Sequence, residues 1–315
     1  MKTSVTRILI LFFPVLFLSC NKEAEPPLNP PQVQTPYTIE VPPGFPTQLN
    51  IPEENPMTVE GVELGRFLFY DTRLAGRAGE GKLMSCASCH IQENGFVIGL
   101  PRPHPVGLDG IPTHHGMLPL INLVWNPVTF GWNVSVPTIE DDVLSVITDP
   151  SEFGSSLEKV ETAIRLIPGY AERFEKAFGT PEVTAERIAR AIAQFVRTLV
   201  SSNSRFDHYL RGEVQLTQSE LKGFVLFTTE EGADCFHCHG GFGNPLFTTN
   251  LFYNNGKDTV FPGTDDRYAI TGDPMDKGAY KATTLRNIEL TGPYMHDGRF
   301  ATLEDVIDFY AHGLL

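Results

Sequence analysis

The sequence predicts a mainly α-helical protein in which two similar domains follow one another along the chain. Residues 84–90 and 234–240 both contain the pattern Cys-x-x-Cys-His. An apolar stretch with the spacing of an amphipathic helix precedes each pattern, over residues 59–71 in the first case and from Leu221 in the second. The same order of helix and cysteine pattern therefore occurs twice, as expected for tandem copies of one kind of domain.

The repeated pattern is the attachment signature of a c-type haem. The two thiols would form thioethers with the vinyl groups of one haem, and the histidine that follows would ligate its iron. A redox disulfide needs no such histidine, and the two halves of a zinc ribbon would lie about 15–20 residues apart. Here the patterns lie 149 positions apart (235 minus 86). We therefore expect two haem c groups in two tandem cytochrome c-like domains, each made of helices and loops around one haem. The attachment residues are Cys86, Cys89 and His90 in the first domain and Cys235, Cys238 and His239 in the second.

Residues 1–20 are expected to be a lipoprotein signal peptide. Lys2 and Arg7 precede an apolar run over residues 8–18. This run is shorter than the roughly 20 residues that a transmembrane helix needs. It ends at Cys20 in a pattern that resembles a bacterial lipobox, where the signal is cut before an acylated cysteine. The expectation is a lipid anchor at Cys20 on the periplasmic side of a bacterial membrane. The alternative is an ordinary signal peptide with an unmodified cysteine.

The next segment, residues 21–56, is rich in proline and is expected to be an extended or disordered spacer. About 260 residues then remain, which is enough for two domains of ordinary size. We place the N-terminal domain with the first haem at residues 57–203. The C-terminal domain with the second haem would occupy residues 204–315.

Helices are predicted from apolar periodicity and from capping residues at their starts. Thr184 and Thr302 are candidate caps, and Thr217 opens a capping box with Glu220. The predicted helices cover residues 59–71, 138–148, 170–178, 185–200, the stretch that follows Thr217, and 303–312.

The formal net charge of −14 argues against nucleic acid as a partner. Loss of Lys2 and Arg7 with the signal would remove two positive charges and bring it to −16. A basic cytochrome c-like protein would meet this surface at an increased rate and could donate electrons. A quinol is the other candidate donor. The alternative is that the acidity serves only solubility.

Several segments resemble the bacterial di-haem cytochrome c peroxidase family, which includes the MauG-like proteins. They agree in order and spacing from about residue 58 to the end of the chain. The resemblance implies that the first haem reacts with hydrogen peroxide and that the second transfers electrons. The matching segments are residues 64–71, 85–90, 206–210, 284–287 and 291–298.

The resemblance also implies roles for residues between the motifs. Trp132 would lie between the haems, with core packing as its alternative role. Glu152 would be the acid–base group at the reactive haem, or else an exposed loop residue. Asp142 stands where the family usually has Gln. The family run Trp-Asp-Gly-Arg is replaced by residues 132–135, Trp-Asn-Val-Ser, so the arginine is lost.

Two further metal contacts follow from the resemblance. Thr291 and Pro293 match backbone ligands of a calcium ion, although Gly116 stands where the family has an Asn ligand. One calcium ion is therefore an open expectation. Tyr310 stands at the position of the sixth ligand of the second haem, where the peroxidases carry Met and MauG-like proteins carry Tyr. Met295 is the alternative ligand.

Three functions are consistent with the sequence. The first is a di-haem peroxidase that reduces hydrogen peroxide to water with electrons from an external donor. The second is MauG-like, peroxide-dependent oxidation of a protein substrate. The third is a di-haem electron carrier without catalysis of its own.

Overall fold

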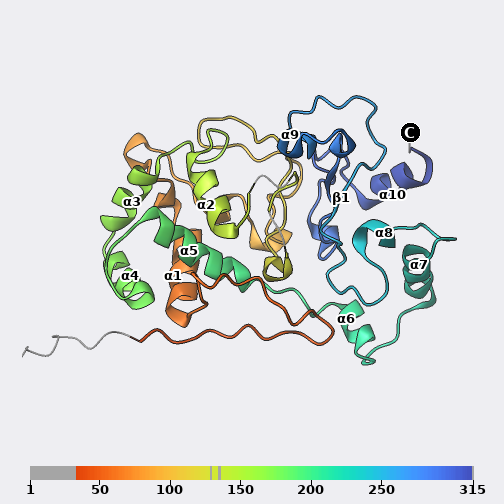
Figure 1. The fold of residues 1–315 in the computed structure, drawn as a ribbon, viewed down its shortest axis with the longest axis horizontal. Helices are drawn as coiled ribbons and strands as arrows, with labels where there is room; N and C mark the ends of the chain where they lie inside the picture. The colour runs from red at the N-terminus through yellow and green to blue at the C-terminus, as the bar shows by residue number, and fades with distance from the viewer. Residues whose placement is uncertain (1–32, 128–129, 134–135, 314–315) are drawn as a thin grey trace, which may run out of the picture. The chain divides into compact units, whose positions relative to one another are not determined.

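The computed structural model describes residues 33–127, 130–133 and 136–313, and helices dominate its regular structure (Figure 1). The described residues also form a small antiparallel sheet, in which β1 (Phe252–Tyr253) pairs with β2 (Tyr280–Lys281). Within this part of the chain, no helix is long and apolar enough to cross a membrane. The helices are α1 (Val59–Tyr70), α2 (Ile139–Thr148), α3 (Leu157–Arg165), α4 (Tyr170–Phe178), α5 (Ala185–Arg197), α6 (Arg205–Leu210), α7 (Gln218–Thr228), α8 (Phe236–His239), α9 (Tyr268–Thr271) and α10 (Leu303–His312). The predicted fold class, mainly α, is confirmed.

Threonine side chains start most of the predicted helices. Thr58, Thr138 and Thr184 each accept a hydrogen bond from a backbone N–H of the first helical turn. Each bond satisfies a donor that the helix itself cannot pair. Thr217 and Thr302 both belong to capping boxes, in which an acidic side chain three residues later bonds back to the threonine N–H. The capping signals in the sequence are thus confirmed.

The sequence prediction missed α3, α6 and the four-residue α9. Helix α3 begins after the cap Ser156 and buries only Val160 and Ile164, so its apolar stripe is narrow. Helix α6 has six residues, which is less than two turns and too short to show a helical period. The prediction also made α5 too long, because the N–H of Thr198 already bonds to the carbonyl of Phe195 in a tighter turn.

Helices α1 and α5 form the centre of the core in the first half of the chain. Their buried apolar side chains pack together with those of α2 and α4; the main ones are Leu64, Leu68, Phe69, Ile188, Ile192 and Phe195. Gly65 lies directly against the backbone of α5. A β-carbon at this position would stand 1.9 Å from the carbonyl oxygen of Ala191. The contact between the two helices therefore depends on the absence of a side chain at Gly65.

The proline-rich segment is packed against the domain over residues 33–56, so the expectation of a free spacer is wrong there. Ile39 and Phe45 are buried in a cluster with Trp125 and with Leu246 of the second half. The indole Nε1 of Trp125 donates to the carbonyl of Pro46 at 2.8 Å. Apolar side chains of this segment hold it on the surface of the fold. The signal peptide, Cys20 and residues 21–32 lie outside the described residues.

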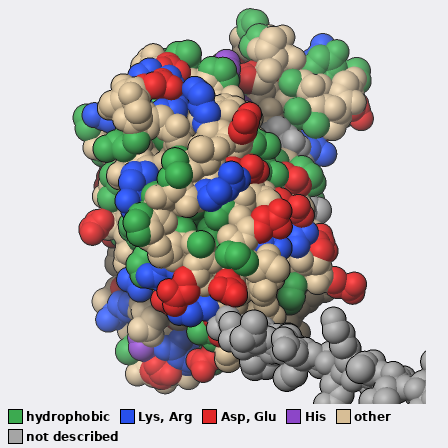
Figure 2. Space-filling view, turned by 90° about the vertical axis from the view of Figure 1, so that its left-hand side faces the viewer, with side chains coloured by type: hydrophobic (Ala, Val, Ile, Leu, Met, Phe, Trp, Pro, Cys, Tyr) green, Lys and Arg blue, Asp and Glu red, His purple; other side chains and the backbone are tan. Residues whose placement is uncertain are grey.

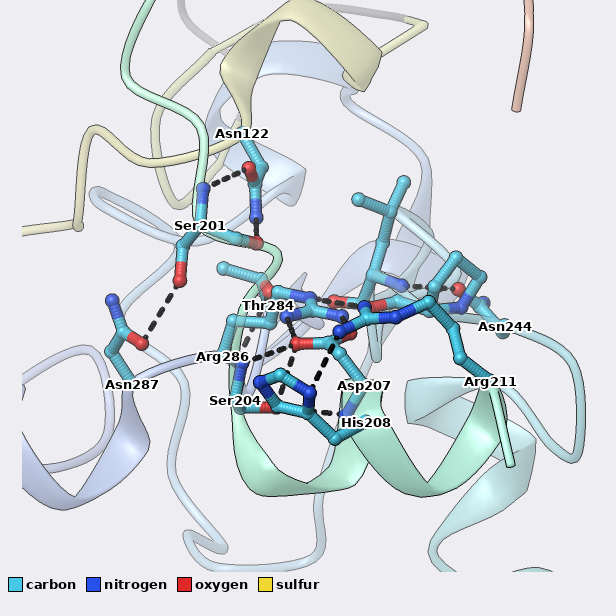
Figure 3. A network of polar contacts seen from close by, with 12 residues as sticks. Asn122, Ser201, Ser204, Asp207, His208, Arg211, Asn244, Thr284, Arg286 and Asn287 are labelled. Atoms are coloured by element: carbon cyan, nitrogen blue, oxygen red, sulfur yellow. Dashed lines mark hydrogen bonds and ion pairs between the residues drawn. The ribbon is translucent and has the colours of Figure 1, made fainter. Parts of the chain in front are cut away.

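Buried polar contacts hold the second half together and join it to the first (Figure 3). The guanidinium of Arg286 makes two hydrogen bonds to the carboxylate of Asp207, at 3.0 and 2.6 Å, and both side chains are buried. The side chain of Asn122 donates to the carbonyl of Ser201 and accepts from its N–H. The Ser201 hydroxyl then lies 3.1 Å from the side-chain oxygen of Asn287. Segments more than 70 residues apart in sequence are thus connected by fully paired polar groups.

On the face toward α3 and α4, acidic and basic side chains lie intermixed with scattered apolar ones (Figure 2). Lys176 pairs with Glu172 at 2.7 Å and Lys159 pairs with Glu80 at 3.2 Å. Exposed pairs of this kind contribute about 0–1 kcal/mol each. They balance charge locally on this face and contribute little to the stability of the fold.

A buried ion pair has a larger effect on the stability of the fold than these exposed pairs. Arg197 of α5 forms two hydrogen bonds with Glu140 of α2, at 2.8 and 3.0 Å, and its side chain is 1% exposed. The same guanidinium donates to the carbonyl of Asn50, and Asn55 donates to Glu140. This network joins α2, α5 and the N-terminal segment.

We expect Arg197→Met to lower the free energy of unfolding by about 3–5 kcal/mol, because it leaves the Glu140 carboxylate buried without its partner. Urea denaturation followed by circular dichroism measures this loss. The matched control is Arg190→Gln, which removes an exposed pair with Glu186 on the same helix and should cost no more than about 0.5 kcal/mol. Equal effects of the two variants would contradict the assignment.

Candidate functional site

A cavity of about 460 Å³ lies where the two halves of the chain meet. First-half residues in its lining include His90, Trp132, Asp142 and Glu152, and Lys281 is contributed by the second half. A smaller adjoining hollow of about 80 Å³ shares some of these residues and adds the first cysteine pair. The structure therefore brings together His90 and Lys281, which lie 191 positions apart in the sequence (281 minus 90).

His90 is oriented as a metal ligand should be. Its Nδ1 lies 2.7 Å from the carbonyl oxygen of Phe96, which fixes the proton on Nδ1 and leaves the lone pair of Nε2 available for iron. Burial lowers the pKa of His90 to about 4, against a smaller opposing effect of the Phe96 carbonyl. The imidazole is therefore neutral at pH 7, as ligation requires. Phe96, which the sequence analysis did not single out, is thus the positioning group of His90.

The cysteines of the first motif lie in a setting that keeps them protonated. Cys86 and Cys89 are free thiols. Burial raises the pKa of Cys86 to about 12 and that of Cys89 to about 11, and the negative charge of Glu152 adds to both shifts. A reactive redox pair would have a lowered pKa, so this environment argues against that alternative.

The second motif lies on α8 and the residue before it. Its thiols, Cys235 and Cys238, are free, and burial raises the pKa of each. Burial lowers the pKa of His239, while the nearby carbonyls of Thr283 and Phe247 oppose part of this shift. Among the described residues, no atom lies within hydrogen-bond geometry of the buried His239 Nδ1. These properties again fit a neutral iron ligand beside two thioether-forming cysteines.

Two carboxyl groups with raised pKa values line the cavity beside His90. Glu152 lies in the turn after α2, where its N–H bonds to the carbonyl of Asp149. Burial raises its pKa to about 7, with further contributions from the negative charges of Asp142 and Asp149. Burial alone raises the pKa of Asp142 on α2 to about 6. Glu152 is therefore not an exposed loop residue, and both carboxyls can exchange protons near neutral pH.

Trp132 lies in the wall of the cavity. Its Nε1 donates to the carbonyl of Gly116 at 2.8 Å, and its own carbonyl accepts from the N–H of Lys281 at 2.8 Å. The ammonium of Lys281 is buried and donates to the side-chain oxygen of Asn126 at 3.1 Å. Burial lowers the pKa of Lys281 to about 8. Trp132 and Lys281 thus line one cavity and are joined through their backbones.

Both candidates for the sixth ligand of the second iron lie near Asn255. The Asn255 amide is 3.6 Å from the sulfur of Met295, and Asn255 also counteracts part of the pKa shift of Tyr310. Burial raises the pKa of Tyr310, and the nearby Cys238 and Cys235 add to this effect. Tyr310 nevertheless keeps 43% of its surface exposed, and α10, to which it belongs, has no buried residue. The expected inward, apolar setting of Tyr310 is therefore only partly realised, and its ligand role stays a prediction.

The calcium expectation also stays a prediction. Gly116 offers no side-chain oxygen, although the carbonyls of Pro103, Met295 and His296 lie near its α-carbon. The Thr291 hydroxyl donates to the carbonyl of Ile288. In the described part of the chain, no group of three or more His, Cys, Asp or Glu side chains is arranged to hold a metal ion.

Comparison with known proteins agrees with this geometry. Residues 59–215 match the family described as di-haem cytochrome c peroxidase. The chain is 35% identical to methylamine utilization protein MauG of Methylorubrum extorquens over 264 residues, covering 83% of this chain and 71% of MauG. It is also 35% identical to cytochrome c551 peroxidase of Nitrosomonas europaea over 262 residues, covering 80% of this chain and 73% of that protein.

Solved structures agree as well. A MauG-like protein associated with microbial copper homeostasis superposes with a TM-score of 0.79 at 36% identity, covering 89% of this chain and 83% of that one. The dihaem peroxidase BthA from Burkholderia thailandensis superposes with a TM-score of 0.67 over 89% and 81% of the two chains. At 21% identity this second match supports the fold alone. Together they confirm the predicted fold of two tandem cytochrome c-like domains.

We expect two covalently bound haems per chain, measured by the pyridine haemochrome assay. Replacing Cys235 and Cys238 by alanine should leave one haem, because the second motif then offers no thiols for the vinyl groups. The control Phe236→Leu changes a residue between these cysteines and should keep both haems. A single haem in the unmodified chain would contradict the expectation.

Proposed function

Because the chain belongs to the family of di-haem cytochrome c peroxidases and MauG proteins, and is therefore an oxidoreductase, we propose that it reduces hydrogen peroxide to water. The electrons would come from a small cytochrome c-like protein, with a quinol as the other donor to assay. The observation that supports this reaction is the pair of carboxyls, Glu152 and Asp142, in the cavity beside His90. An electron carrier without catalysis has no use for such a pair.

Reduction of peroxide consumes two electrons and two protons and yields two molecules of water. During this reaction a proton must move from one oxygen of hydrogen peroxide to the other, so that the second oxygen can leave as water. Glu152 is suited to carry this proton, because a pKa of about 7 lets it accept and release a proton with similar ease. The haem on His90, when bound, supplies the iron that binds peroxide and passes the electrons.

Asp142 has two effects on the proton carrier. Its negative charge helps to raise the pKa of Glu152, and its own raised pKa makes it a second proton store. Because two carboxyls in one cavity influence each other, they titrate as a pair. Trp132, in the wall of the same cavity, would carry electrons arriving from the haem on His239.

Glu152→Gln should slow peroxide reduction by about 100-fold or more, which is the usual loss when a positioned acid–base group is removed. Steady-state assays with a reduced cytochrome measure the rate. The absorption spectrum of the second haem should stay unchanged. As a control, Glu158→Gln alters an exposed carboxyl on α3 and should leave the rate unaffected. An unchanged rate in Glu152→Gln would contradict the role and make Asp142 the next candidate.

The role of Glu152 as proton carrier predicts how the rate of peroxide reduction depends on pH. Glu152 must be deprotonated to accept a proton from peroxide, and its raised pKa keeps it protonated below about pH 7. The kcat/KM for peroxide should therefore rise with pH through about 7 and then level off. This rise should be absent in Glu152→Gln.

A second candidate function is MauG-like oxidation of a protein side chain, favoured by a tyrosine at position 310 beside the second cysteine pair. An anionic oxygen ligand stabilises oxidised iron, whereas methionine raises the reduction potential. The second haem would then store an oxidising equivalent instead of accepting electrons from ordinary cytochromes.

Substitution of Tyr310 tests this alternative through the potential of the second haem, measured by spectroelectrochemical titration. Tyr310→Met should raise the potential markedly. Tyr310→Phe removes the ligand and should give the spectrum of a five-coordinate or water-bound haem. If both variants keep the wild-type potential and spectrum, Tyr310 is not the ligand and direct peroxide reduction gains support.

We also propose that Cys20 is acylated and anchors the chain on the periplasmic side of a bacterial membrane, as the lipobox-like sequence indicates. Cys20→Ser should move the protein from the membrane fraction to the periplasmic extract. Immunoblots of the two fractions measure the change. Retention of the serine variant in the membrane fraction would contradict the anchor.

A further inference from the structure

A stack of aromatic rings leads away from the cavity at Trp132. The ring centres of Trp132 and His296 lie 6.4 Å apart, with 74° between the ring planes. His296 in turn stacks on Tyr280, with 3.6 Å between centres and 8° between planes. Trp132 and Tyr280 are thus joined through one intervening ring, and Trp132 itself lines the cavity of His90.

Backbone contacts hold these rings in place. Trp132 donates through Nε1 to the carbonyl of Gly116, and the N–H of Gly116 donates to the carbonyl of His296 at 2.6 Å. Tyr280 belongs to β2, where the next residue, Lys281, bonds through its N–H to the carbonyl of Trp132. Hydrogen bonds to the backbone thus connect the segments that carry Trp132, His296 and Tyr280.

Carboxylates lie near the far end of the stack. The ring of His115 packs edge-on against Tyr280, with 5.8 Å between ring centres, and its Nε2 lies 3.9 Å from the carboxylate of the partly exposed Asp265. Burial, followed by the charges of Asp265 and Asp266, raises the pKa of Tyr280. A phenol that loses an electron becomes a strong acid, so a nearby carboxylate allows the electron and the proton to leave together.

We propose that Tyr280 is a redox relay, through which electrons reach Trp132 from outside the cavity. The proposal rests on the proposed peroxide chemistry and adds a second route to the one from the haem on His239. It also gives an oxidising equivalent a path from the cavity to a half-buried tyrosine, close to partly exposed side chains such as Asp265. The oxidant is hydrogen peroxide.

The electrons and protons balance as follows. Each peroxide takes up two electrons and two protons and forms two waters. When the external donor is absent, Tyr280 supplies one of the electrons by way of Trp132, and its O–H proton moves to Asp265. The other electron would come from the haem on His90, when bound, and solvent would supply the two protons that the waters require. The product is a neutral tyrosyl radical. An electron from a one-electron donor and the return of the proton from Asp265 restore the phenol.

The experiment mixes the oxidised holoprotein with hydrogen peroxide in the absence of a donor and freezes it within a second. Electron paramagnetic resonance then detects radicals, and optical spectra of parallel samples report the reaction of the haems. Ring-deuterated tyrosine narrows the signal if the radical is on tyrosine. Tyr280→Phe keeps the stacked ring and removes the hydroxyl. The control Tyr268→Phe removes a hydroxyl on α9, outside the stack.

We expect a tyrosyl signal in the wild type and in Tyr268→Phe, its loss in Tyr280→Phe, and a weaker signal in Asp265→Asn. The haem spectra should respond to peroxide in every variant. An unchanged signal in Tyr280→Phe, or no tyrosyl signal while the haems respond, overturns the relay and leaves the proposed function standing. If the wild-type haem spectra do not respond to peroxide, the proposed function fails, and the relay fails with it.

Discussion

Burial of the groups around His90 is the constraint on which the chemistry of this protein depends. Burial is the largest influence on the pKa of His90, which it lowers, and on those of Glu152, Asp142 and Cys86, which it raises. In each case the neutral form is favoured over the charged one. One physical cause thus yields a neutral ligand, two carboxyls that exchange protons near neutral pH, and thiols kept in their protonated form.

Close helix packing in the first half buries these groups. The contact of α1 with α5 requires Gly65, and the buried pair of Arg197 and Glu140 ties α5 to α2, which carries Asp142. The second half is packed differently, since α7 and α10 bury none of their described side chains. It depends more on polar contacts such as Asp207 with Arg286, and its haem motif is less enclosed.

The functional cavity belongs to neither half alone. The first half contributes His90, Glu152 and Trp132 to its lining, and the second contributes Lys281. Outside the lining, the ring of Tyr280 reaches Trp132 through His296. A change in how the halves meet would alter the surroundings of Trp132 and leave the attachment of the haems intact. Electron transfer is therefore expected to respond to the interface more than haem content does.

The sequence by itself determined the features that depend only on residues close together in the chain, namely haem attachment and helix starts. Cys86, Cys89 and His90 lie within five positions, and their covalent and ligand chemistry follows from that spacing alone. Helix starts such as the box at Thr217 are equally local, because a cap bonds to the first turn that follows it.

Only the tertiary structure decided the environments of these groups. Packing of Ile39 against Trp125 and Leu246 overturned the expected spacer at residues 33–56, because burial depends on segments distant in sequence. The backbone bond between Lys281 and Trp132 joins residues 149 positions apart (281 minus 132). The pKa of about 7 at Glu152 likewise requires burial by the fold and the nearby charges of Asp142 and Asp149. Desolvation and charge act through space, and distances in space between remote residues exist only once the chain has folded.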